Sequence, residues 1–150
     1  MRRQLEQLSA GSISKDSFEL EYNDMHAFHG GETLTVIGDA LTGRYLFRNE
    51  VSPEQIEPPP TTLTAEQLHT LVELLLEIEA WEQRVPAREA VPDESAASLS
   101  IRVGTVESNI WEWYNDLSGN DRLVRVKQLL EEIAGPLPDE QTARDEVHSI

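Results

Sequence analysis

The sequence predicts an α+β fold, in which a mainly antiparallel sheet of about five strands carries a long helix on one face and is followed by a second, C-terminal helix. Short stretches of alternating apolar and polar residues come in groups of three and then two, and each group precedes a stretch of helical periodicity. The predicted order is therefore strand, strand, strand, helix, strand, strand, helix. Because strands and helices do not alternate one for one, this order argues against a parallel α/β sheet.

The first group of strands is expected within residues 17–50. Apolar and polar residues alternate over 18–22 and again over 33–36, and a third strand is expected over 44–49. The segment 38–43, GDALTG, contains Gly and Asp, which tolerate the positive φ angles of hairpin turns. These three strands are predicted to form an antiparallel meander.

Two stretches have the capping residues and apolar spacing of helices. The first helix is expected to begin at a capping box formed by Thr64 and Gln67 and to end before Pro86. The second is expected to begin at Asn120 and to end at Gly135.

The second group of strands is expected between these helices. Residues 99–103 alternate, residues 107–109 are expected to turn the chain, and a last strand is expected over 110–114. The three prolines at 58–60 indicate a stiff connector before the long helix, or else a polyproline ligand for an aromatic-lined groove.

A length of 150 residues points to one domain. We place this α+β domain at residues 17–134. Residues 1–16 are predicted to be a flexible N-terminal segment, and residues 135–150 a loosely ordered acidic tail without apolar periodicity.

Charge is the strongest feature of the composition. Twelve Lys and Arg face 28 Asp and Glu, a net charge of −16, and residues 61–97 carry the densest excess of acids. Such a surface repels nucleic acids and anionic lipids and favours a basic protein partner, although it also simply promotes solubility. Without cysteine, a signal peptide or an apolar run of roughly 18 residues, the chain is expected to be cytoplasmic, with no membrane association.

The segment Met25–Gly31 contains two histidines, three residues apart, followed by two glycines. His26 and His29 are candidate metal ligands, and further ligands would come from Asp24, Glu32 or His69. Because the chain has neither cysteine nor an H-E-x-x-H motif, no metal or cofactor is expected. The segment is instead predicted to be a strand-end turn, in which Gly30 and Gly31 permit a sharp bend or a close backbone approach.

No catalytic residue is expected. The serines lack a G-x-S-x-G context, and the many carboxylates make any close pair of acids uninformative. The protein is therefore predicted not to be an enzyme.

The layout resembles the emfourin family of small bacterial proteins, typified by an inhibitor of thermolysin-like metalloproteases. The matching pieces are Gly30-Gly31 after an aromatic residue, the strand ETLTVIGD and the helix from Leu68 to Ile78. The family pattern is similar to Tyr, three residues, Gly-Gly. Here His26 occupies the matching spacing and Tyr22 lies farther away. The resemblance implies a bacterial protein with a protein-binding role for the Gly-Gly segment.

These observations predict a non-enzymatic protein-binding module, such as an inhibitor, immunity-type protein or adaptor, with a basic partner. The alternatives are a metal-binding protein or hydrolase-like enzyme that uses His26 and His29, and a structural domain, monomeric or homodimeric. Trp111 and Trp113 are expected either to pack in the core or, if they face away from the helix, to form an interface. The partner-binding candidates are Met25, His26, Phe28, His29, Gly30, Gly31, Glu73, Glu77, Glu82, Trp111 and Trp113.

Overall fold

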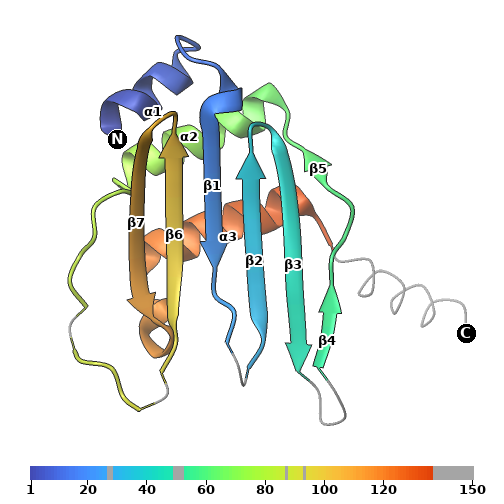
Figure 1. The fold of residues 1–150 in the computed structure, drawn as a ribbon, viewed down its shortest axis with the longest axis vertical. Coiled ribbons are helices and arrows are strands. Elements are labelled where there is room, and N and C mark those ends of the chain that lie inside the picture. The colour runs from blue at the N-terminus through green and yellow to red at the C-terminus, as the bar shows by residue number, and fades with distance from the viewer. Residues whose placement is uncertain (27–28, 49–52, 87, 93, 137–150) are drawn as a thin grey trace, which may run out of the picture.

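One antiparallel sheet carries α2 and α3 across one face, and α1 packs against α2, which confirms the predicted α+β class (Figure 1). The structure is a computed structural model that describes residues 1–26, 29–48, 53–86, 88–92 and 94–136. The strands are β1 (Phe18–Asn23), β2 (Gly31–Ile37), β3 (Ala40–Arg48), β4 (Pro53–Ile56), β5 (Thr61–Thr62), β6 (Ala96–Val103) and β7 (Val106–Trp113). The helices are α1 (Arg2–Ser9), α2 (Ala65–Glu77) and α3 (Asp121–Ala134), with 3₁₀ turns η1 (Lys15–Ser17) and η2 (Tyr114–Gly119).

The strand order is β4-β3-β2-β1-β6-β7, with β5 paired to β3. The first three strands form the predicted meander, and the chain then crosses the helical face through α2 and returns to place β6 beside β1 (Figure 1). This seven-stranded sheet is larger than the predicted sheet of about five strands. The two additional strands, β4 and β5, come from the proline-containing connector. Both pair with β3, while Pro58–Pro60 lie between them, where no ladder N–H is needed.

The core lies between the sheet and the helices. Phe18, Leu20 and Tyr22 of β1 are fully buried, whereas Glu19 and Glu21 point to the opposite face of the sheet, which none of the described helices covers. The helices contribute the buried side chains Leu71, Val72, Leu75, Leu123, Val126 and Leu130. Alternation along the strands and helical spacing along α2 and α3 therefore identify the core correctly.

The N-terminal segment differs from the prediction of a flexible stretch at residues 1–16. Residues 2–9 form helix α1, in which Leu5 is fully buried and Leu8 nearly so, and both belong to the core cluster. Their three-residue spacing places both leucines on one face of a helix, and α2 provides the surface that this face covers. Tertiary packing thus orders a helix too short and polar to be stable alone.

The long helix ends earlier than predicted. The capping box of Thr64 and Gln67 is present as expected. However, α2 ends at Glu77 rather than near Pro86, and Glu79 takes a positive φ of 50°. Arg122 of α3 donates hydrogen bonds to the carbonyls of Ile78, Glu79 and Glu82, and so holds the chain in this non-helical turn.

The starts of β7 and β3 also differ from the predicted positions. The chain turns at Gly104, where φ is 63°, and residues 107–109 lie inside β7 rather than at the predicted turn. Likewise, the turn before β3 is confined to Gly38-Asp39, so the strand begins at Ala40. Helix α3 begins at the predicted cap, with Asn120 accepting a bond from the Leu123 N–H at 3.1 Å. Most of the predicted acidic tail, residues 137–150, lies outside the described residues.

Candidate functional site

The segment Met25–Gly31 joins β1 to β2, and residues 27 and 28 within it lie outside the described residues. His26 and Gly30 exchange backbone hydrogen bonds of 2.8 and 3.0 Å. A Cβ atom at Gly31 would lie 2.5 Å from the backbone oxygen of Asp24, which only glycine avoids. The predicted close backbone approach is thus intramolecular. Met25 is half-buried, and Phe28 lies outside the described residues.

The two histidines pack with an aromatic ring. His26 is buried, with ring centroids 4.5 Å from His29 and 4.4 Å from Tyr114, while His29 is exposed. His69 lies on α2, 3.4 Å from the hydroxyl of Ser9. Within the described part of the chain, no three His, Asp or Glu side chains are grouped so as to hold a metal ion.

A buried charge cluster formed by Tyr22, Asp24, Glu32 and Lys127 lies beside this turn, between the sheet and α3. Both oxygens of Asp24 accept hydrogen bonds: one from the Glu32 N–H at 2.8 Å, the other from the Tyr22 hydroxyl at 2.8 Å and from Lys127 Nζ at 2.5 Å. Lys127 Nζ also lies 3.5 Å from Glu32 Oε1 and 5.9 Å from the Tyr22 ring centroid. One ammonium group on α3 thereby joins the ends of β1 and β2.

The buried charge cluster has perturbed titration. Burial, followed by the negative charge of Glu131, raises the pKa of Glu32 to about 7. Burial alone would lower the pKa of Lys127, but the hydrogen bond and charge of Asp24, with the charge of Glu32, outweigh it and leave that pKa raised. Burial likewise raises the pKa of Tyr22, and that of Tyr45 to about 12.

An acidic groove runs between α2 and α3 on the solvent side of the helices and has a volume of about 710 Å³. Its floor includes the half-buried Leu74 and Leu129, and its rim carries more acids than bases. The lining residues are His69, Thr70, Glu73, Leu74, Glu77, Arg125, Gln128, Leu129 and Glu132. Its three carboxylates outnumber its one guanidinium, so the acids and the arginine of the lining sum to a net charge of −2.

Two of the three glutamates predicted to bind a partner line this acidic groove. Glu77 pairs with Arg125 at 2.5 Å, and Glu73 accepts a hydrogen bond from Ser9 Oγ at 2.5 Å. Both side chains are more than half exposed, at 64% and 52%. Glu82 follows the end of α2 and does not line the groove.

The two strand tryptophans lie on the sheet face opposite the helices. Trp111 pairs with Ser98, on the face that also carries Glu19 and Glu21, so neither tryptophan packs under the helix with Trp81. Their rings meet edge to face at 4.7 Å, and both residues are half-buried. Trp111 and Trp113 therefore face away from the helices, which is the orientation that the interface alternative requires.

The connector between α2 and β6 covers the outer edge of β7. The Gln83 amide accepts a bond from the Trp111 N–H at 2.7 Å and donates to the Trp111 carbonyl at 3.2 Å, as a neighbouring strand would. Trp113 Nε1 donates to the carbonyl of Arg88 at 3.1 Å.

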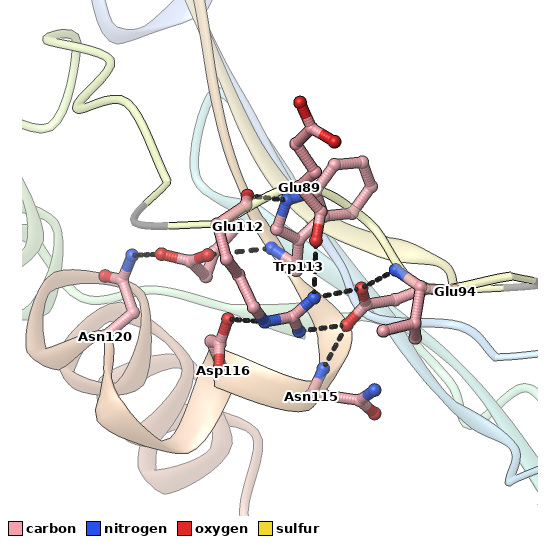
Figure 2. A network of polar contacts seen from close by, with 9 residues as sticks. Glu89, Glu94, Glu112, Trp113, Asn115, Asp116 and Asn120 are labelled. Atoms are coloured by element: carbon pink, nitrogen blue, oxygen red, sulfur yellow. Dashed lines mark hydrogen bonds and ion pairs between the residues drawn. The ribbon is translucent and has the colours of Figure 1, made fainter.

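Figure 2 shows the polar network that fixes the end of this connector. The guanidinium of Arg88 meets both oxygens of Glu94, at 2.7 and 2.5 Å, and Asp116 at 2.9 Å. Glu94 also accepts a bond from the backbone N–H of Asn115, and its side chain is only 1% exposed. The hydrogen bond from Arg88 lowers the pKa of Glu94 to about 2. This closed arrangement joins the connector to η2 and serves stability.

The sequence reasoning missed Lys127 and Arg122, the cations that hold α3 to the rest of the protein. Lys127 and Asp24 are 103 positions apart, and Arg122 and Ile78 are 44 apart. A basic residue on an otherwise apolar helical face would have been the available signal, because buried cations need partners.

Comparison of the chain with protein-family models, curated proteins and solved structures gives no match. Among the described residues, no helix has both the length and the apolar character needed to cross a membrane.

Proposed function

We propose that the protein is a non-enzymatic binding module whose acidic groove receives a basic, amphipathic segment of another protein. The observation that carries this proposal is the combination of an apolar floor and an acidic rim. Leu74 and Leu129 are available to one or two apolar side chains of a partner, and Glu73, Glu77 and Glu132 surround them with negative charge.

The negative charge of the protein favours a basic partner. The groove is part of a chain of net charge −16, so long-range attraction favours a positively charged partner and repels an acidic one. Because the rim glutamates are exposed, each ion pair contributes only about 0.2–1 kcal/mol, and the charges act mainly on the association rate and on specificity. Burial of the two leucines supplies the remaining affinity.

The partner-binding residues assigned by this proposal differ from the predicted set. Glu73 and Glu77 remain, and Glu132 and Arg125 join them. Glu82 lies outside the groove lining and is expected to contribute less.

The test uses variants of opposite expected effect. Affinity capture from a lysate at low and moderate salt supplies a partner, and titration calorimetry with the purified partner measures its affinity. The double variant Glu73→Lys/Glu77→Lys is expected to weaken binding by about tenfold or more, that is by about 1.4 kcal/mol or more. Arg125→Gln removes the groove's cation and is expected to strengthen binding.

A matched control places the same charge change elsewhere. Glu21→Lys/Glu107→Lys alters two exposed acids on the uncovered sheet face, so it reports the effect of net charge alone. If this control weakens binding as much as the groove variant, or if Arg125→Gln also weakens it, the groove is not the binding surface.

A further inference from the structure

We propose that Glu32 holds a proton in the folded protein around neutral pH and that its ionisation weakens the docking of α3 on the sheet. This inference is independent of the function assigned to the acidic groove. It is derived from the buried charge cluster of Tyr22, Asp24, Glu32 and Lys127.

Hydrogen-bond donors are unevenly distributed between the two carboxylates of the cluster. Asp24 receives the backbone N–H of Glu32, the hydroxyl of Tyr22 and the ammonium of Lys127. Glu32 is 6% exposed, yet its Oε1 atom has no hydrogen-bond partner within the described residues. The ammonium of Lys127 lies 2.5 Å from Asp24 but 3.5 Å from Glu32, so Asp24 has the closer contact with the cation.

The charged groups around Glu32 also affect its protonation. The groups facing Glu32 are Tyr22 and Asp24 from β1 and its end, Tyr45 across from it on β3, and Lys127 and Glu131 from α3. When ionised, Asp24 and Glu131 act on Glu32 as like charges, and the ammonium of Lys127 opposes them. A buried carboxylate whose Oε1 atom accepts no hydrogen bond from the described residues, and which has two like charges nearby, favours the neutral form, as the pKa of about 7 for Glu32 also indicates.

The proton on Glu32 affects the contact between α3 and the sheet. Through Lys127, α3 reaches both Asp24, which follows β1, and Glu32 of β2. When Glu32 loses its proton, a second buried negative charge appears beside the Asp24–Lys127 pair and next to Glu131 of the same helix. The resulting desolvation and repulsion act between the sheet and α3, which is the surface that the helix must cover.

The direct test is a carboxylate titration of the intact protein by ¹³C NMR, with the side-chain Cδ of Glu32 assigned. Glu32 is expected to titrate close to pH 7, and Glu21, exposed on the other face of β1, is the reference carboxylate measured in the same spectra. A Glu32 midpoint below about pH 5 would overturn the proposal.

Two variants test the coupling. In Glu32→Gln, a neutral amide replaces the carboxyl group at every pH. We therefore compare the unfolding equilibrium constants of the two proteins. The ratio of the wild-type constant to that of Glu32→Gln is expected to rise about tenfold per pH unit between pH 5 and 7 and then to level off. Glu21→Gln, which removes an exposed carboxylate from the other face of β1, is the matched control. Lys127→Met removes the cation and is expected to move the Glu32 midpoint still higher. A lower midpoint would contradict the assigned geometry.

Amide hydrogen exchange locates the effect. After correction for the intrinsic exchange rate, protection of α3 is expected to fall between pH 6 and pH 8 by a larger factor than protection of β1 and β6. Equal changes in the helix and the strands would refute the link to α3. If Glu32→Gln does not fold, the NMR titration and the exchange data on the wild type decide both parts.

Discussion

Removal of the Arg122 guanidinium is expected to cause one of the largest losses of stability that a single substitution produces in this protein. Arg122 is 9% exposed and donates to three backbone carbonyls beyond the end of α2, at 2.8 Å to Ile78 and Glu82 and at a shorter distance to Glu79. These carbonyls belong to a turn that no strand or helix completes, and the negative end of the helix dipole adds to the attraction.

The magnitude follows from these contacts. A hydrogen bond with a charged partner contributes roughly 1.5–3 kcal/mol, so three give roughly 4.5–9 kcal/mol. Part of this is recovered, because burial disfavours the charged guanidinium and lowers its pKa. We therefore expect Arg122→Met to lower the free energy of unfolding by about 3–5 kcal/mol, a large share of the roughly 5–15 kcal/mol typical of a domain.

Urea unfolding at neutral pH, followed by far-UV circular dichroism and tryptophan fluorescence, measures this loss. Arg125→Met is the matched control on the same helix, because Arg125 makes an exposed ion pair with Glu77 and should change stability by no more than about 1 kcal/mol. Arg122→Lys is expected to fall between the two, since one ammonium cannot reproduce the fork of a guanidinium. A loss below about 1 kcal/mol for Arg122→Met would refute the capping role.

Three further predictions concern the edge of the sheet, the turn and the connector. Gln83→Ala uncovers the backbone of Trp111 on the edge strand, so light scattering is expected to show more concentration-dependent self-association than in the wild type; a variant that self-associates no more than the wild type would contradict this. Gly31→Ala forces a Cβ to within 2.5 Å of the Asp24 carbonyl, and thermal unfolding should show a loss of about 2 kcal/mol or more, which an unchanged midpoint would exclude. The pKa of Glu94 is lowered to about 2, so its contribution is present above about pH 4.5 and is lost as the pH falls toward 2. Glu94→Gln should therefore be less stable than the wild type at pH 7 but approach it at pH 2, and equal differences at both pH values would disprove the linkage.

Local patterns predicted much of the fold. Alternation identified the buried faces of β1, β2 and β6, and the capping residues Thr64 and Asn120 marked the starts of α2 and α3. Such signals are reliable because each depends on residues within a few positions of one another. The tight turn at Gly30-Gly31 was predictable for the same reason: its backbone constraint is local.

Local sequence patterns predicted less of the candidate sites. The acid excess of residues 61–97 led to Glu73 and Glu77, but α3 supplies the other wall of the groove, and nothing near Glu73 indicates it. From the sequence, Asp24 and Glu32 are candidates only as metal ligands, because Lys127, with which both form ion pairs, is distant in the sequence. The face occupied by the tryptophans depended on which side of the sheet the helices cover, and strand alternation is symmetric in that choice.

The sequence by itself thus determined which segments are helices and strands, which of their residues are apolar enough to be buried, and the strongly acidic character of the surface. The tertiary structure alone decided where α2 stops, that residues 2–9 form a helix, and that a lysine and two carboxylates meet in a buried cluster. The physical reason is range: propensity and capping act over one turn of chain, whereas burial and charge pairing act between side chains that only the completed fold brings together.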